Sequence, residues 1–105
     1  MKKNILKKAI GQYVIVRSRN EGINAGKLIA ADETGCVIKN ARRLWYMKAK
    51  DPKQAWYEGV ANTGVNSESK LSPPVSKKFI IEDYSITICS DIAKKIIKGA
   101  PNHEG

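Results

Sequence analysis

The residues best suited to bind a ligand lie in one short segment, residues 37–46, with the sequence Val-Ile-Lys-Asn-Ala-Arg-Arg-Leu-Trp-Tyr. Two adjacent arginines, Arg42 and Arg43, are followed closely by Trp45 and Tyr46. A guanidinium group forms paired hydrogen bonds to phosphate oxygens, and an aromatic ring stacks on a nucleobase. The segment therefore indicates a site for a phosphate-bearing nucleotide or for nucleic acid.

Nine side chains form the candidate ligand-binding set, which combines cations for phosphate groups with an amide and aromatic rings for a base. They are Arg17, Lys39, Asn40, Arg42, Arg43, Trp45, Tyr46, Trp56 and Tyr57. Tryptophan is more often part of a core than of a binding surface, so Trp45 and Trp56 have packing roles as alternatives. Arg17 lies at a predicted strand end, where a charge also prevents edge-to-edge pairing.

The adjacent arginines have an internal alternative as well. Both stand between apolar residues of a predicted strand, and a buried guanidinium is costly without an anionic partner. That partner is either a phosphate of the ligand or an internal carboxylate, Glu82 or Asp83. The sequence leaves these two possibilities open.

The charge of the chain also favours an anionic partner. The 105 residues include 19 Lys and Arg against 10 Asp and Glu, which gives a net charge of +9. Such a charge is typical of proteins that meet nucleic acids, nucleotides or acidic surfaces. A chain of this length, with 42% hydrophobic residues, can bury one core and so predicts a single domain.

Residues that could catalyse a reaction form no recognisable motif. The single histidine, His103, lies in a predicted tail. The acidic pairs Asp32-Glu33 and Glu82-Asp83 lie at predicted turns, where solvated carboxylates are usual. We therefore expect a protein that is not an enzyme.

The two cysteines, Cys36 and Cys89, each lie in an apolar run with no further metal-ligating residue nearby. Buried free thiols are a better interpretation than a disulfide or a zinc site. No metal and no cofactor are expected.

The N-terminal ten residues predict a basic tail or a short helix and no secretory signal. Lysines interrupt every apolar run before an uncharged stretch of about 7 residues can form. No segment approaches the roughly 20 apolar residues of a membrane span. We expect a cytoplasmic protein with no membrane partner, consisting of the segment 1–10, a single domain over residues 11–99 and a tail over residues 100–105.

Apolar and β-branched runs predict strands over residues 13–18, 26–31, 36–39, 79–81 and 84–89. The third strand continues toward Tyr46 if Asn40-Ala41 forms a bend or bulge, which would place one arginine at the rim and the other outside. Residues 62–74 are rich in Asn, Ser, Gly and Pro and predict a mobile surface loop, long enough to act as a lid.

Two helices are predicted between and after these strands. Asp51-Pro52 with Gln54 forms a helix-start pattern for a short helix over residues 52–61, which Gly64 ends. Ser90 or Asp91 caps a second helix that runs to Lys98. The order of elements predicts an α+β fold, in which a small, strongly bent antiparallel sheet or barrel of about five strands carries a short middle helix and a C-terminal helix.

The runs Val-Ile-Val-Arg at residues 14–17, Gly-Ile-Asn-Ala-Gly-Lys-Leu at residues 22–28 and residues 37–46 resemble a family of small phage- and prophage-encoded proteins of unknown function. The resemblance covers residues 12–98, and Asn-Ala-Arg-Arg-Leu-Trp is its most specific part. The segment from Gln54 to Gly59 departs from the plainer family helix. The resemblance implies a phage origin, and hence the cytoplasm of a host cell.

Two kinds of binding use the same residues; we expect the first, and the second is its alternative. In the first, the protein sequesters a phosphate-bearing nucleotide immune signal of the host, a cyclic oligonucleotide or an ADP-ribose derivative, and so counteracts antiviral defence. In the second, it is an accessory protein that binds single-stranded nucleic acid, with lysines along the backbone and aromatic rings on unpaired bases. The basic surface also permits a protein inhibitor of an acidic host partner.

Sequestration predicts a homo-oligomer. Nanomolar affinity requires about 12 kcal/mol, whereas two charge-assisted contacts and two base stacks supply roughly 5–12 kcal/mol before entropic costs. A ligand enclosed at a subunit interface would gain stronger phosphate contacts because water is excluded there.

Overall fold

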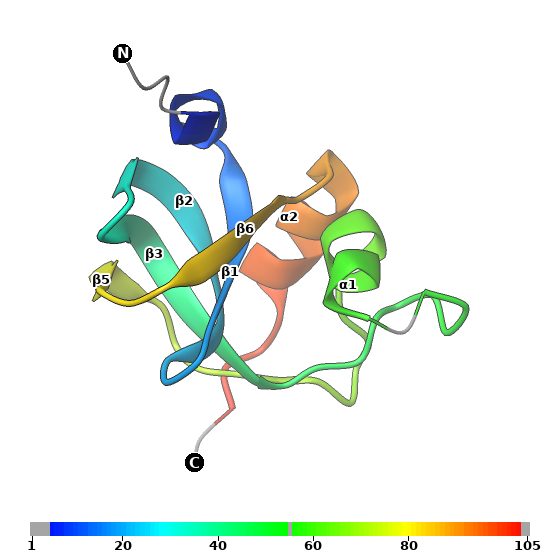
Figure 1. The fold of residues 1–105 in the computed structure, drawn as a ribbon. Helices are drawn as coiled ribbons and strands as arrows, with labels where there is room; N and C mark the ends of the chain where they lie inside the picture. Colours follow the sequence, from blue (N-terminus) through cyan, green and yellow to red (C-terminus); the bar gives the residue numbers. More distant parts are fainter. Residues whose placement is uncertain (1–4, 55, 104–105) are drawn as a thin grey trace.

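The structure, a computed structural model, describes residues 5–54 and 56–103. A 3-10 helix, η1 (Ile5–Ala9), precedes three long strands, β1 (Tyr13–Ser18), β2 (Gly22–Asp32) and β3 (Gly35–Tyr46) (Figure 1). The chain continues through α1 (Tyr57–Thr63), β4 (Lys70–Leu71), β5 (Val75–Ile80), β6 (Tyr84–Ile88) and α2 (Asp91–Gly99). Among the described residues, no helix is long and apolar enough to cross a membrane.

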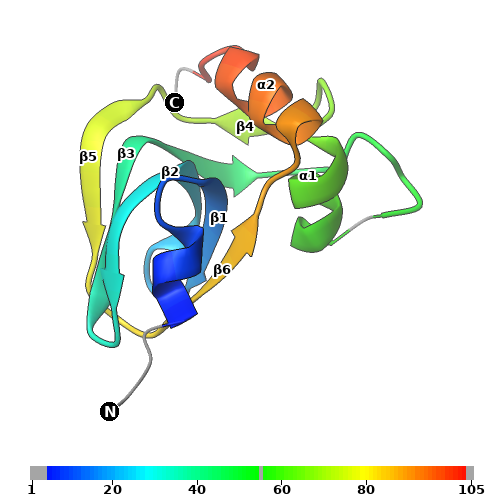
Figure 2. The ribbon, with the colours of Figure 1, turned by 90° about the horizontal axis from the view of Figure 1, so that it is seen from above.

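The six strands form one antiparallel sheet in the order β4-β3-β2-β1-β6, with β5 paired to β3 beyond the end of β4. The edge strands β5 and β6 are joined by only three residues, 81–83, so the sheet must bend strongly to bring its two edges together (Figure 2). The predicted α+β fold with a bent antiparallel sheet and two short helices is confirmed. The sheet has six strands and stays open.

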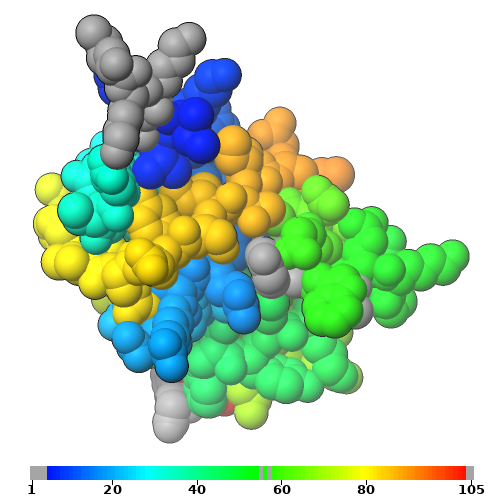
Figure 3. Space-filling model, in the orientation of Figure 1, coloured from blue at the N-terminus to red at the C-terminus, as the bar shows by residue number. Residues whose placement is uncertain are grey.

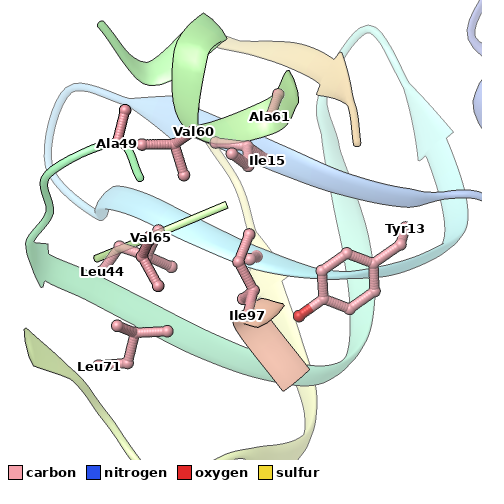
Figure 4. Close-up of a cluster of buried hydrophobic side chains, with 10 residues drawn as sticks. Tyr13, Ile15, Leu44, Ala49, Val60, Ala61, Val65, Leu71 and Ile97 are labelled. Carbon is pink, nitrogen blue, oxygen red and sulfur yellow. The ribbon is translucent and has the colours of Figure 1, made fainter. Parts of the chain in front are cut away.

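Apolar residues on one side of the sheet pack against both α-helices. Tyr13 and Ile15 of β1 lie with Leu44 of β3, Val60 of α1 and Ile97 of α2 (Figure 4). The Tyr13 ring lies with its hydroxyl toward Ile97, and burial raises the pKa of this phenol, with a further contribution from Cys89. This cluster fixes the two helices on the sheet.

A second cluster fills the hollow inside the bend. The alternate residues of β1, Val14 and Val16, meet Leu28, Ile38 and Ile80 there. Because both sides of β1 are covered, this strand reads as a continuous apolar run. Ala9 of η1 closes one end of the hollow, so residues 5–9 form the short helix that was one of the two N-terminal alternatives. Residues 1–4 lie outside the described part.

Asn40 produces the predicted bend in β3. Its backbone has φ 52°, a conformation that asparagine tolerates better than most residues. Between two register pairs, Ala25 with Arg42 and Lys27 with Lys39, β3 contains one residue more than β2. This bulge shifts the alternation of β3, so Arg42 points under α2 and Arg43 points to solvent.

The middle of the chain differs from its predicted form. The helix begins at Tyr57 instead of residue 52, because the Asp51 carboxylate accepts hydrogen bonds from Lys53 N (3.0 Å) and Gln54 Nε2 (3.3 Å) in a turn. Gly64, with φ 87°, ends the helix as predicted.

Residues 62–74 are not one uninterrupted surface loop as predicted, because residues 62–63 belong to α1 and residues 70–71 form β4. Val65 and Leu71 are buried in the core, Leu71 belongs to β4, and Val65 pairs with Ala49. Two apolar residues spaced six apart are enough to hold a polar segment in place. Two other strands are longer than predicted, since β2 begins at Gly22 and β5 at Val75.

We expect Gly59→Ala to destabilise the fold although alanine normally stabilises a helix by about 1 kcal/mol relative to glycine. A Cβ atom at Gly59 would lie only 1.7 Å from the carbonyl oxygen of Gln54, so the turn before α1 would have to move. Urea unfolding should show a loss of about 2 kcal/mol or more. Gly99→Ala in α2 is the matched control, because its Cβ would meet nothing within 4 Å; equal stability of the two variants would contradict this account.

Candidate functional site

Two aromatic side chains lie exposed at the end of β3 with a lysine between them. Trp45 and Tyr46 are 50% and 43% exposed. Lys70, the cross-strand neighbour of Tyr46, places Nζ 5.7 Å from the centre of the Trp45 ring and 5.8 Å from that of Tyr46. These are cation–π distances. At this exposure Trp45 is not part of the core, which was the alternative to a ligand contact.

His103 completes this group, which we call the aromatic edge and define as Trp45, Tyr46, Lys70 and His103. The rings of Trp45 and His103 meet edge to face with centres 4.9 Å apart. The backbone N–H of His103 donates to the Leu71 carbonyl oxygen at 2.9 Å, which lays the end of the chain beside β4. Sequence reasoning missed His103 because it follows the last helix and its only signal was its residue type.

Arg43 lies on the same side of β3 as Trp45, since the two residues are two positions apart in a strand. Its backbone is held by Ser72, whose Oγ accepts from Arg43 N at 2.8 Å. The guanidinium lies over Gly22, with Nη2 3.5 Å from where a Cβ would stand. No described carboxylate forms an ion pair with it, so its charge is available to a ligand.

Arg42 is buried, only 3% exposed, and forms no ion pair with a carboxylate of the described residues. Its Nη1 donates to the carbonyl oxygens of Ile97 (2.6 Å) and Ala100 (2.8 Å), and its Nε donates to that of Ser72 (2.9 Å). Its Nη2 donates to the Pro101 carbonyl (3.3 Å) and to Asn102 Oδ1 (3.1 Å). Burial lowers the pKa of this group, while the negative end of the α2 dipole favours its charge.

Arg42 therefore has neither of the two kinds of partner that the sequence predicted. In place of a ligand phosphate or the carboxylates of Glu82 and Asp83, its partners are neutral carbonyl oxygens at the C-terminal end of α2, which carries only a partial negative charge. Sequence reasoning had no access to this contact, because Ile97 is 55 residues away and the acceptors are main-chain oxygens that every residue has.

Glu82, the proposed internal partner, holds the turn between β1 and β2 instead. Its Oε2 accepts from the backbone N–H groups of Asn20 (2.8 Å) and Glu21 (3.1 Å), and its Oε1 accepts from Asn20 Nδ2 (2.8 Å). The neighbouring Ser18 hydroxyl and these amides lower the pKa of Glu82 to about 2. Because Ser18 Oγ makes no hydrogen bond of acceptable geometry, we assign the effect to the amides.

The other candidate residues lie apart from the aromatic edge. Lys39 is exposed between Lys27 and Lys77 on the strands that flank β3. Asn40 is exposed and shapes the bulge. Arg17 is on β1, which β2 separates from β3, and lines an open hollow of about 540 Å³.

Two aromatic candidates lie in or next to α1. Trp56, 76% exposed, is the residue before that helix, so the packing alternative for it is wrong. The side chain of Tyr57 lies outside the described part of the structure. Of the nine candidates, the structure thus groups Arg43, Trp45 and Tyr46.

The aromatic edge brings together aromatic rings and a cation, which are groups that suit ligand binding. Glu68, two residues before Lys70, is paired with Lys48 at 2.9 Å. Over the described residues, no three His, Cys, Asp or Glu side chains gather as metal ligands. Both cysteines are free, and burial raises the pKa of Cys36 to about 11 and of Cys89 to about 12. Thiols of such high pKa are poor nucleophiles at neutral pH.

The front of the molecule offers a different surface, formed mostly by β6. Figure 3 shows β6 (gold) at the surface between η1 and the turn that joins β1 to β2. A hollow of about 270 Å³ beside it is lined by Asp32, Glu33 and Asp83 together with Tyr84 and Ile86. Acidic residues are therefore concentrated on this surface, away from the aromatic edge. Because their carboxylates repel an anion, this surface is poorly suited to bind phosphate.

A family model described as a domain of unknown function, DUF6948, matches residues 11–97. Comparison with curated proteins found no match. Comparison with solved structures also found none.

The two adjacent arginines should differ sharply in their effect on stability. Arg42→Met leaves the carbonyl groups at the end of α2 without a donor, and we expect a loss of about 3 kcal/mol in urea unfolding. Arg43→Met, at an exposed position one residue away, should change the free energy of unfolding by less than about 0.5 kcal/mol. Equal losses in the two variants would contradict the assignment of Arg42 to the fold.

Glu82→Gln should lower the melting temperature in a pH-dependent way. The pKa of the folded carboxyl is below its ordinary value, so ionised Glu82 stabilises the fold above about pH 4.5, and this stabilisation is lost as the pH falls toward 2. Calorimetry at pH 7 and pH 2 should therefore show a gap between wild type and variant that closes at the lower pH. Glu33→Gln controls for the change in net charge, and a gap that widens on acidification would refute the pKa assignment.

Proposed function

The chain belongs to this family of unknown function, and we propose that it binds single-stranded nucleic acid at the aromatic edge and at Arg43, without catalysing a reaction. The observation that carries the proposal is the position of Lys70 between the rings of Trp45 and Tyr46. Two half-exposed aromatic rings with an ammonium group within 6 Å of both ring centres suit successive bases and the phosphate that joins them.

The expected affinity follows from the number of base stacks and phosphate contacts. Each base stack contributes roughly 1–3 kcal/mol and each charge-assisted phosphate contact roughly 1.5–3 kcal/mol before the costs of association. Trp45 and Tyr46 supply two stacks, and Arg43 and Lys70 supply two phosphate contacts. The sum suits a micromolar, salt-dependent complex with an open strand, to which the net charge of +9 adds a non-specific attraction.

Sequestration of a phosphate-bearing nucleotide by a phage-encoded protein is the second candidate. The half-exposed Trp45 and Tyr46 could clamp a single base if another subunit covered them. Arg42 is no longer available to the phosphates, because the end of α2 occupies its donors. One chain alone therefore falls short of the roughly 12 kcal/mol of nanomolar affinity, and this candidate depends on a homo-oligomer.

The test is fluorescence anisotropy with a labelled dT10 oligonucleotide at 50 and 200 mM salt. Trp45→Ala should weaken binding by roughly 5- to 100-fold, which corresponds to the loss of one base stack. Arg43→Gln should reduce the salt dependence by about one phosphate contact. Trp56→Ala, which removes a still more exposed tryptophan elsewhere, should leave binding unchanged.

Two results would overturn the proposal. One is a loss of dT10 binding in Trp56→Ala with none in Trp45→Ala. The other is tight, weakly salt-dependent binding of cyclic dinucleotides or ADP-ribose with no binding of dT10, which would favour sequestration instead.

A further inference from the structure

A second surface, on the outer side of β2, β3 and β5, carries two parallel rows of side chains. Register pairs place Lys27 beside Lys39 and Lys39 beside Lys77, and we call these three residues the lysine row. The next row, on the same side of the sheet, consists of Ala30, Val37 and Phe79, which we call the apolar row. All three lysines are exposed.

The lysine row is an unfavourable arrangement within the chain itself. Like charges directly opposite one another on neighbouring strands destabilise a sheet. Carboxylates elsewhere in the described structure pair with Lys48 and Lys78, but with none of these three lysines. Lys78 is the instructive contrast, because it points to the inner side of β5, where its Nζ lies 3.0 Å from Glu21 Oε1 and donates to Asn24 Oδ1 at 2.9 Å. The outer face thus lacks the anion that the inner face supplies.

The apolar row is also exposed to solvent. Phe79 is 63% exposed, and Ile81, just past the end of β5, is 78% exposed. Together with Ala30 and Val37 they line a shallow hollow of about 230 Å³, whose lining also includes Asp32 and Thr34 from the turn between β2 and β3. The apolar row beside a row of cations fits a partner that carries acidic and apolar groups a few ångströms apart.

The strand β5 also has a free edge. In the described structure it pairs only with β3, and Figure 2 shows it along the border of the molecule with no element beyond it. Its six residues, about 20 Å of strand, therefore offer a line of main-chain donors and acceptors. A lysine on an edge strand normally discourages pairing with another strand. A second copy of this chain paired through β5 would bring its own lysine row to the same face, where the like charges repel. An acidic strand, in contrast, is attracted by the charge of the lysines.

We propose that β5 is a docking edge for an acidic, extended peptide segment of a partner protein, which adds to the sheet as a further strand. Side chains on one face of a strand alternate with period two. The peptide would therefore place an acidic residue beside Lys77 and, two positions away, an apolar residue beside Phe79. Both rows of the sheet would be continued by one strand, and the lysine row would gain its anion.

This inference is independent of the proposed nucleic-acid site. Lys39 and the aromatic edge lie on either side of the bulge at Asn40, which puts Arg43 and Lys39 on opposite sides of β3. Variants of the two surfaces can therefore be tested separately.

The probe, called the Val–Glu peptide, is a labelled ten-residue peptide of the repeat Glu-Thr-Val-Thr, which places Glu and Val two positions apart on one face of a strand. It is titrated by fluorescence anisotropy, and the same peptide with Lys in place of Glu is its charge control. We expect saturable binding of the Val–Glu peptide only. Lys77→Glu should weaken it at least 10-fold and Phe79→Ala at least 5-fold, whereas Lys53→Glu, the same charge reversal in an exposed turn, should stay within 2-fold. Hydrogen exchange of the amides of β5 should slow when the peptide is bound.

Any of three results would overturn the proposal. The first is no saturable binding of the Val–Glu peptide to the wild-type protein. The second is equal binding by Lys77→Glu and Lys53→Glu, with melting temperatures showing both variants folded. The third is a loss of dT10 binding in Lys77→Glu with peptide binding unchanged, which would assign this face to nucleic acid.

Discussion

The hydrogen bonds of Arg42 to the end of α2 are the contact on which the rest of the structure depends. A single buried guanidinium joins β3 to the carbonyl groups of Ile97, Ala100 and Pro101 and to that of Ser72. It thereby fixes the last helix on the sheet and directs the chain end back along β4. His103 reaches the Trp45 ring only because this segment is held in place. A residue that resembled a ligand contact is thus the one that builds the site.

The bulge at Asn40 explains how two adjacent arginines acquire opposite roles. In an unbroken strand, neighbouring residues also face opposite sides, but the extra residue decides which of the two turns inward. With the bulge, Arg42 enters the space between the sheet and α2, and Arg43 emerges beside Trp45. The same irregularity separates Lys39 from the aromatic edge. One backbone conformation therefore divides a continuous basic segment into three parts: buried Arg42, exposed Arg43 beside the aromatic edge, and exposed Lys39 on the side of β3 opposite to Arg43.

Much of the fold follows from local pattern, whereas the site follows from long-range contacts. Alternation and β-branched residues predicted β1 and β6, and Gly64 and Ser90 marked two helix ends where the structure has them. Asp51 led to a wrong helix start, because its carboxylate accepts backbone hydrogen bonds in a turn as readily as at the first residues of a helix. The burial of Val65 and Leu71 could not be predicted from a polar segment, nor could the partners of Arg42, since main-chain carbonyls leave no sequence signal.

The measurement that tests the account most directly is a heteronuclear NMR spectrum of the arginine Nε–H and tryptophan indole N–H groups with and without dT10. The account predicts a slowly exchanging Arg42 Nε–H signal, because this group donates to the buried Ser72 carbonyl oxygen at 2.9 Å, and that signal should not move on binding. The signals of Arg43 and Trp45 should shift, and that of Trp56 should not. A rapidly exchanging Arg42 signal that shifts with dT10, while Arg43 and Trp45 stay unchanged, would contradict it.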